Sequence, residues 1–170
     1  MKTITASGLN VVMRSATTEV LAELEAIRKA AFAPVFDSFR SILGEEIYQL
    51  AQAAEDKAQD KLLASALASD SDWQVYAAEV DGAIAGFVSI QLNVEIRVGE
   101  IGLNAVHPEQ AGQGIGTVMY NFAVAKMKEA GMQVATVATG GDPSHASARR
   151  AYEKAGFTVQ IPSVWMCQKL

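Results

Sequence analysis

Three glycines stand at every second position of the stretch "HPEQAGQGIG": Gly112, Gly114 and Gly116. A glycine inside a helix costs about 1 kcal/mol relative to alanine, yet an apolar pattern with helical spacing begins at Ile115. The first turn of a helix leaves backbone N–H groups unpaired, and these groups, with the helix dipole, attract anions such as phosphate. Without β-carbons, phosphate oxygens can approach the backbone. The stretch therefore predicts either a phosphate-binding loop or a tight strand-to-helix turn without a ligand.

Two familiar phosphate motifs do not fit this loop. The nucleoside-triphosphate loop needs a lysine before its Ser or Thr, but here Thr117 follows Gly116 directly. The dinucleotide fingerprint needs a third glycine where this sequence has Thr117 or Met119, and it follows the first strand of its fold. This loop follows several predicted strands, so a different phosphate ligand is expected.

The loop must be positioned by the elements around it. Apolar and β-branched runs predict strands over 73–80 and 83–93, joined by an Asp81-Gly82 hairpin turn, then strands over 99–108 and 132–139. A helix is expected from about 115 to 130. A second helix is expected over 142–156, with Asp142 as its cap and Pro143 in its first turn.

The two ends of the chain complete the prediction. A strand over 9–17 leads into a helix over 19–31, which Pro34 interrupts. A second helical region over 34–69 breaks near Gly44, and "FTVQ" and "SVWMCQKL" are predicted to finish the chain as short strands. An apolar stripe through Leu50 and Leu62 is expected to be buried, and an acidic set is expected to form a solvated face: Glu45, Glu46, Glu55, Asp56 and Asp60.

Composition limits the class of protein. The chain has 170 residues, half of them apolar, and a net charge of −5, which predicts one soluble domain over residues 1–170 and argues against a nucleic-acid partner. No stretch approaches the roughly 20 apolar residues of a membrane helix. The lone Cys167 favours a cytoplasmic protein and is expected to be buried and inert. His107 and His145 are too far apart to indicate a metal site, so none is expected.

Two segments carry a family resemblance. "AVHPEQAGQGIGTVMYNFAVAKMKEAG" resembles the acetyl-coenzyme A segment of the GCN5-related N-acetyltransferases (GNAT), whose signature is [Gln/Arg]-x-x-Gly-x-[Gly/Ala]. In this sequence the signature runs over 111–116, with Ala111 where Gln or Arg is usual. "HASARRAYEKAGF" resembles the family's later motif, Asn-x-x-Ala-x-x-x-Tyr-x-x-x-Gly-Phe, with His145 in place of Asn. The resemblance covers most of 9–19 and 73–158 and leaves 32–69 unexplained.

The resemblance implies a fold and a co-substrate. The fold would be the acyl-CoA N-acyltransferase fold, an α/β architecture with a mixed, centrally splayed sheet of about six to seven strands flanked by helices. Its cofactor-binding core would cover about 73–158, and a helical acceptor-side segment would cover about 19–69. Arg149, Arg150 or Lys126 could supply local positive charge. The residues implied to hold acetyl-CoA are Ala105, Val106, Gly112, Gln113, Gly114, Ile115, Gly116, Thr117 and His145.

The implied reaction is direct acetyl transfer from the thioester to a primary amine in a ternary complex. The departing thiolate needs an acid, and Tyr152 matches the family's tyrosine, because a phenol with a pKa near ~10 keeps its proton at rest. The attacking amine needs a base, and Glu100 stands where the histone-acetylating branch has a glutamate. A partly desolvated carboxylate there would have a raised pKa. The alternatives are that Tyr152 is a core aromatic and that Glu100 is a strand-end residue in water.

The acceptor is left open. Phe32, Phe36, Phe39 and Tyr48 could line one wall of its site or belong to the core, and Asp37, Glu45 or Glu46 could attract a cationic amine. A small molecule is expected because the chain has no extra recognition domain, and a homodimer is possible. Two other functions stay open: a non-catalytic acyl-CoA-binding module, and an acyltransferase that uses a longer acyl donor.

Overall fold

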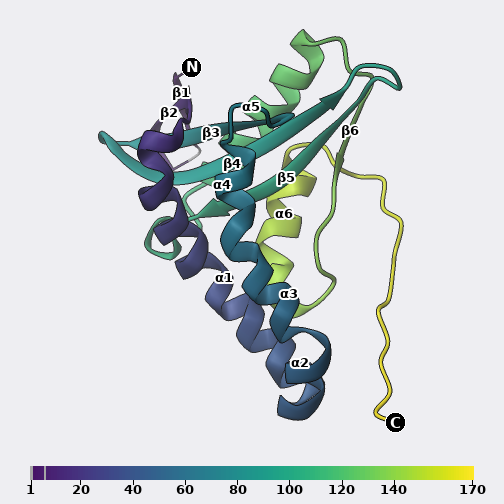
Figure 1. Cartoon of the computed structure of the whole chain (residues 1–170). Helices are drawn as coiled ribbons and strands as arrows, with labels where there is room; N and C mark the ends of the chain where they lie inside the picture. Colours follow the sequence, from purple (N-terminus) through teal and green to yellow (C-terminus); the bar gives the residue numbers. More distant parts are fainter. Residues whose placement is uncertain (1, 6) are drawn as a thin grey trace.

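In the computed structural model, which describes residues 2–5 and 7–170, six strands form one sheet in chain order (Figure 1). Neighbouring strands are antiparallel from β1 to β5, and β6 joins β5 in parallel. β1 was not predicted from the sequence. The strands are β1 (Lys2–Ile4), β2 (Asn10–Ser15), β3 (Trp73–Val80), β4 (Ala83–Asn93), β5 (Val98–Val106) and β6 (Val134–Val137).

The β3–β4 hairpin confirms the strand bounds and the turn that were predicted from the sequence. β3 and β4 have the predicted bounds, 73–80 and 83–93. Asp81 and Gly82 both have positive φ, 51° and 83°. This is the geometry of a two-residue turn whose twist matches that of the flanking strands. The hairpin anchors β5, which pairs with β4 along almost its whole length.

The sheet opens beside the end of β5. Between the pairs Ile90↔Ile101 and Val88↔Asn104, β5 carries one more residue than β4, which marks a bulge. On the other side of β5, the pairing with β6 reaches Ile101↔Val137, where β6 ends, while β5 continues to Val106. The two strands therefore part after Ile101, as a splayed sheet requires.

Helices cover both faces of this sheet (Figure 1). α5 (Ile115–Glu129) and α6 (Ala146–Lys154) pack on one face, in a core that includes Ile101 and Met119. The other face holds a smaller core with Leu24, Leu63 and Phe87. The helices on that side are α1 (Leu21–Leu43), α2 (Glu45–Ala51), α3 (Ala53–Ala58) and α4 (Leu62–Ala66). Short 3-10 turns occupy Thr18–Val20, Gln59–Lys61, Pro108–Gln110 and Pro143–His145.

The predicted interruption at Pro34 is wrong, because α1 continues through that residue to Leu43. A proline inside a helix removes one N–H donor and crowds the carbonyl four residues earlier. Pro34 is exposed, so water can hydrate that carbonyl. The predicted break at Gly44 is confirmed, since Gly44 ends α1 with φ 73°.

The predicted burial of the region 45–69 is wrong in part. The chain breaks into three short helices with a 3-10 turn between α3 and α4, so a single helical stripe does not apply. Leu50 and Leu62 are exposed, while Leu63 is fully buried. Asp56, predicted to be solvated, is buried and accepts hydrogen bonds from Tyr48 Oη (2.7 Å) and Gln52 Nε2 (2.8 Å).

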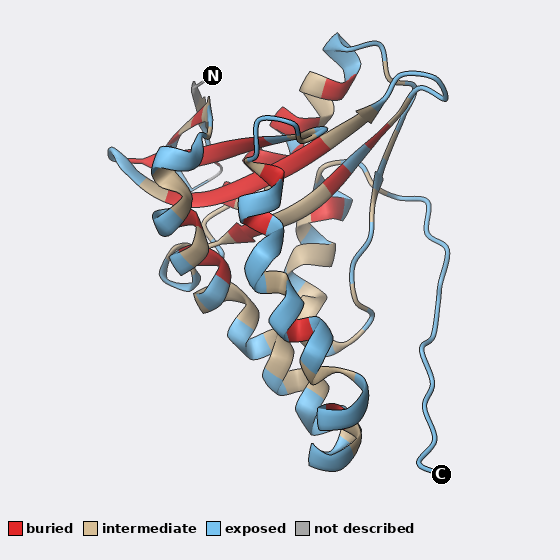
Figure 2. Cartoon of the chain, in the orientation of Figure 1, coloured by how far each residue is buried: buried red, intermediate tan, exposed pale blue. Residues whose placement is uncertain are grey.

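The predicted last two strands are not formed in the described chain. After α6 the chain runs as an exposed, extended tail beside the body of the molecule (Figure 2). Cys167 is exposed rather than buried. The tail is anchored near its end by Lys169, which donates to Glu46 on α2 at 2.8 Å. The alternation of apolar residues predicted an extended backbone correctly, but it did not provide a strand partner.

Candidate active site

The glycine loop ends as an open helix N-terminus. Gly112 and Gly114 have φ values of 78° and 87°, which L side chains rarely adopt. Gly114 is the N-cap of α5, and among the described residues no side chain caps it. The first intrahelical bond shown runs from Val118 N to Gly114 O (3.1 Å), so the N–H groups of residues 115–117 lack intrahelical partners. The loop presents several backbone donors on an uncapped 15-residue helix.

Two residues between β1 and β2 contact this loop. Ser7 Oγ donates to Gln113 O at 2.8 Å, and Thr5 is buried beside Gly114. A β-carbon on Gly114 or on Gly116 would meet its nearest protein neighbours at ordinary contact distances, 3.4 and 3.7 Å. The positive φ of Gly114 explains that glycine, whereas neither backbone conformation nor protein packing explains Gly116, as expected if a ligand approaches the backbone there.

Most of the remaining predicted cofactor residues lie around this loop and the end of β5. Ala105 is buried and pairs with Phe87 on β4, and Val106 pairs with Gly86. Both lie beyond the point where β6 ends, so the backbone edge that faces away from β4 borders the opening. Ile115 is 1 % exposed and belongs to the core, so it can contribute its backbone N–H but not its side chain. Thr117 is partly exposed in the first turn of α5.

Tyr152 is both a core residue and a polar one. Its side chain is buried in the α5–α6 core, and its ring lies 4.3 Å from that of Tyr120. Asn104 Nδ2 donates to Tyr152 Oη at 3.0 Å, and Tyr120 Oη donates to Asn104 Oδ1 at 2.8 Å. Burial raises the pKa of Tyr152, so this phenol is neutral at rest.

Asn104 and Tyr120 were missed by the sequence analysis. Asn104 bridges two phenols from α5 and α6 to the bulged part of β5, and it also donates to Gly102 O at 2.8 Å. The available signal was a polar amide inside the apolar strand "GLNAV". Such a residue must have hydrogen-bond partners when it is buried.

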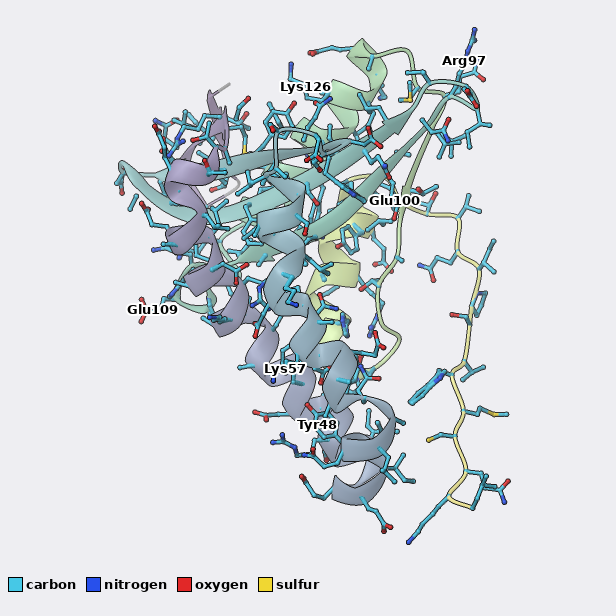
Figure 3. All side chains as sticks on the ribbon, viewed as in Figure 1. Tyr48, Lys57, Arg97, Glu100, Glu109 and Lys126 are labelled. Carbon is cyan, nitrogen blue, oxygen red and sulfur yellow. The ribbon has the colours of Figure 1, made fainter. Side chains whose placement is uncertain are left out.

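Glu100 is exposed on β5, across from Gln91 on β4 and Thr136 on β6. Its neighbours Gly99 and Ile101 face the α5 side, with a β-carbon on Gly99 colliding with Met127. By strand alternation, Glu100 points to the opposite face from Tyr152. The partial burial that was expected for this carboxyl is therefore missing, since the side chain is exposed. In Figure 3, Glu100 lies on β5 far from Tyr48 on α2.

His145 lies at the start of α6 in a dense hydrogen-bonded group. Its Nδ1 is 2.5 Å from Asp142 Oδ1, and its ring stacks on Phe39 of α1, with centroids 6.0 Å apart. Asp142 Oδ2 accepts from Ser38 Oγ (2.8 Å) and from the N–H and hydroxyl of Ser144. Burial alone would raise the pKa of Asp142, but these hydrogen bonds together lower it well below its usual range. The group joins α1 to α6 across the opening.

The cations near the site already have partners. Arg149 donates to the carbonyls of Gly140 and Asp142, so it shapes the loop before α6. Lys126 pairs with Glu129 at 2.7 Å on the outer turn of α5. Arg150 is exposed. The expectation that Arg149 or Lys126 supplies charge to an anion gains no support from these contacts.

Of the four aromatic residues considered for an acceptor wall, Phe36 and Tyr48 line one hollow, while Phe32 packs against the core on that side of the sheet. Phe32 and Phe36 contact edge to face at 6.1 Å. Phe36 and Tyr48 border a shallow hollow between α1 and the α2–α3 segment, together with Arg40 and Lys57. The carboxylates expected to attract an amine are already paired: Asp37 and Glu45 with Arg40 (4.0 and 3.3 Å), and Glu46 with Lys169.

Within residues 2–5 and 7–170, no group of three or more His, Cys, Asp or Glu side chains is arranged to hold a metal ion. Over the same residues, no helix is both long and apolar enough to cross a membrane.

The arrangement of a glycine loop, an uncapped helix and a splayed sheet agrees with a comparison against protein families. The model of the acetyltransferase (GNAT) family matches residues 36–157, which is more than half of the chain, and the chain belongs to this family. The match includes most of the helical segment that the two sequence motifs left unexplained. Among proteins with curated functions, none matches this sequence significantly.

Solved structures show the same fold at low sequence identity. The PaiA N-acetyltransferase from Thermoplasma acidophilum, in complex with coenzyme A, is 19% identical with a TM-score of 0.69, over 90% of this chain and 92% of that one. An aminoglycoside N-acetyltransferase in complex with coenzyme A is 15% identical with a TM-score of 0.62, over 96% of this chain and 97% of that one. The ribosomal-protein-S18-alanine N-acetyltransferase from Escherichia coli is 16% identical with a TM-score of 0.60, over 86% of this chain and 76% of that one. The acyl-CoA N-acyltransferase fold predicted from the sequence is thereby confirmed.

Proposed function

We propose that this protein transfers the acetyl group of acetyl-CoA to a primary amine of a small molecule, by direct attack in a ternary complex. The observation that carries the proposal is the uncapped N-terminus of α5 beside the open end of β5. Backbone N–H groups there suit a diphosphate, and the parting of β5 from β6 leaves room for an extended pantetheine arm. Two of the structural neighbours were solved with coenzyme A, which supports the same ligand.

The donor is held mainly by backbone groups. The N–H groups of residues 112–117 would hold the diphosphate, with the Thr117 hydroxyl as an additional donor. The backbone of Ala105 and Val106 would pair with the amides of the pantetheine arm, as an added strand pairs with a sheet edge. Because backbone groups do this work, Ala111 in place of Gln or Arg is compatible with binding.

Tyr152 is the proposed acid. When the C–S bond breaks, its electron pair stays on sulfur, and a neutral phenol can supply the proton. Burial keeps this phenol neutral, and Asn104 holds its oxygen near the bulge of β5. The hydrogen bond between Tyr152 Oη and Asn104 Oδ1 is long, 3.3 Å, so the hydroxyl can turn to another acceptor at small cost. Glu100, the base implied by the resemblance, is exposed and lies on the opposite face of β5 from Tyr152.

The acceptor class rests on the α1–α4 side of the opening. Among the structural neighbours, one is an aminoglycoside N-acetyltransferase and another is a ribosomal-protein-alanine N-acetyltransferase, so the fold serves small and protein amines alike. A small amine is proposed because the hollow by Phe36 and Tyr48 is lined by side chains of both charges, including Arg40, Asp56 and Lys57. A cytoplasmic location and a homodimer remain predictions.

A screen for thiol release tests the function. Purified protein is incubated with acetyl-CoA and a panel of aminoglycosides, polyamines, amino acids and short peptides, and free coenzyme A thiol is measured. We expect release with at least one small amine, and mass spectrometry should show the acetylated product. Tight acetyl-CoA binding with no release across the panel would favour a non-catalytic binding module. Release only with succinyl or longer thioesters would favour a different acyl donor.

A further inference from the structure

The hydrogen-bonded group at the start of α6 contains an imidazole whose tautomer is fixed. Asp142 is a carboxylate across the physiological pH range, and a carboxylate only accepts hydrogen bonds. Since His145 Nδ1 lies 2.5 Å from Asp142 Oδ1, Nδ1 must carry the hydrogen. In the neutral ring, Nε2 then has a free lone pair and can accept a proton.

The fold holds this pair firmly from three elements. Asp142 Oδ2 accepts a hydrogen bond from Ser38 Oγ of α1. Arg149 of α6 donates hydrogen bonds to the backbone carbonyls of Gly140 and Asp142. Gly140 has no side chain, and a β-carbon there would come within 2.5 Å of His145 Nδ1 and 2.7 Å of Asp142 Oδ1. The loop is therefore built to bring the carboxylate and the imidazole together.

The ring also lies at the boundary between the two halves of the site. Its face stacks on Phe39, which belongs to α1, the helix that bears the predicted aromatic wall. Along α6, residues 145, 148 and 152 share one face of the helix, so His145 stands two turns before Tyr152 on the same side. The groups that contact the ring are Asp142 and Ser144 from its own segment and Phe39 from α1. Arg149 and Ser38 lie one step further away, because both bind Asp142.

We propose that His145, and not Glu100, is the general base of the acetyl transfer, and that Asp142 is the positioning residue that fixes its tautomer. The proposal rests on the proposed function of this site. Nε2 takes one proton from the incoming ammonium group and releases it to solvent. The neutral amine then forms the C–N bond as the C–S bond breaks. Sulfur takes its proton from Tyr152, and the second amine proton restores Tyr152, so each transfer releases one proton.

The test compares three single variants with the wild type. His145→Asn keeps a donor and an acceptor for the pantetheine arm but has no titratable nitrogen. We expect its kcat to fall about 100-fold with an unchanged Kd for acetyl-CoA, and the pH profile of the rate to differ from that of the wild type. Asp142→Asn should lower kcat by about 10-fold with KM kept, because an amide can favour the other tautomer. His107→Asn, the same change at the second of the two histidines, should keep the pH profile.

Nitrogen-15 NMR of the imidazoles gives a readout independent of turnover. With two histidines in the chain, the His145→Asn spectrum assigns the signals directly. We expect the Nδ1–H form of His145 in the wild type and a loss of that preference in Asp142→Asn. A wild type with Nε2–H as the main form contradicts the proposal, and so does an active His145→Asn with the wild-type pH profile. A wild type that binds acetyl-CoA but acetylates no amine overturns the proposed function, and the base with it.

Discussion

The two sides of the opening differ in the chemical groups that they offer to a ligand. On the donor side, defined here as the end of β5, residues 111–117, α5 and α6, the groups placed to bind a ligand are largely backbone N–H and C=O. On the acceptor side, α1–α4, the available groups are side chains, many of them already tied in pairs such as Arg28 with Asp60 (2.6 Å) and Tyr48 with Asp56.

This contrast explains which part of the site belongs to the fold and which part to the individual protein. A backbone donor survives almost any substitution that keeps the loop geometry, and two neighbours that share only 19% and 14% identity with this chain were solved with coenzyme A or a CoA-containing analogue. An acceptor is distinguished by side chains, and those change freely on helices whose core is small. The donor can therefore be inferred from geometry, whereas the acceptor must be found by screening.

The largest expected effect concerns the core of the acceptor side. Leu63 on α4 is fully buried, while Leu50 on α2 is 81 % exposed. Leu63→Ala should lower the free energy of unfolding by about 2–5 kcal/mol, because it leaves a cavity in a small core. Leu50→Ala should change it by less than about 0.5 kcal/mol. Urea denaturation of both variants checks this, and a loss for Leu50→Ala as large as that for Leu63→Ala would mean that Leu50 is buried, as the stripe predicted.

The second prediction separates chemistry from packing on the donor side. Tyr152→Phe and Tyr120→Phe each remove one phenol from the same partner, Asn104. Both should cost about 1 kcal/mol of stability, but only Tyr152→Phe should lower kcat by about 100-fold. Steady-state kinetics with equilibrium unfolding distinguishes the two effects. Equal loss of turnover in both variants would make Tyr152 a packing residue.

The third prediction uses the two ends of α5. Gly114 precedes the helix with φ 87°, and Gly131 follows it with φ 81°. Replacing either with alanine strains the backbone by about 1 kcal/mol. Only Gly114→Ala should also weaken acetyl-CoA binding, by about 10-fold, because Gly114 lies in the loop whose N–H groups are proposed to hold the diphosphate. Isothermal titration measures this, and matched Kd values for the two variants would place the diphosphate elsewhere.

The fourth prediction concerns how stability depends on pH. Since the folded state lowers the pKa of Asp142, this carboxylate stabilises the fold above its unfolded value of 3.8, and the contribution is lost as the pH falls through the lowered folded-state pKa. At pH 7, Asp142→Asn should lower the free energy of unfolding by roughly 1–3 kcal/mol. Urea denaturation at a series of pH values should show the difference in unfolding free energy between variant and wild type narrowing below about pH 4. Asp37→Asn, at an exposed carboxylate, should show no such trend. A difference in unfolding free energy that stays constant in acid would mean that the charge of Asp142 contributes little to the stability of the fold.

The sequence predicted the donor side well for a physical reason. Glycine spacing, the Asp81-Gly82 turn and the caps of α6 act locally, so β3, β4 and the start of α5 could be placed from nearby residues. The acceptor side depends on contacts far apart in the chain. Burial of Asp56 depends on Tyr48, and burial of Arg28 depends on Asp60, 32 residues away.

The site residues divide in the same way. Tyr152 and the glycines were found by motif, while the partners that define their chemistry were not. Asp142 was predicted as the cap of a helix over 142–156, and it instead caps the 3-10 turn Pro143–His145 that precedes α6, by accepting from the Ser144 N–H. Its second role toward His145 and Ser38 needed the packing of α1 against the loop. Glu100 was chosen by its place on the strand, but its burial could not be known before the strands around it were placed.

An amide-resolved titration with acetyl-CoA tests the central claim most directly. In ¹H–¹⁵N spectra of the folded protein, we expect the largest shifts at the N–H groups of residues 112–117 and at the end of β5 near Ala105 and Val106, and little change along α2 and α3. The absence of any shift at saturating acetyl-CoA, or shifts centred on another surface, would contradict the account.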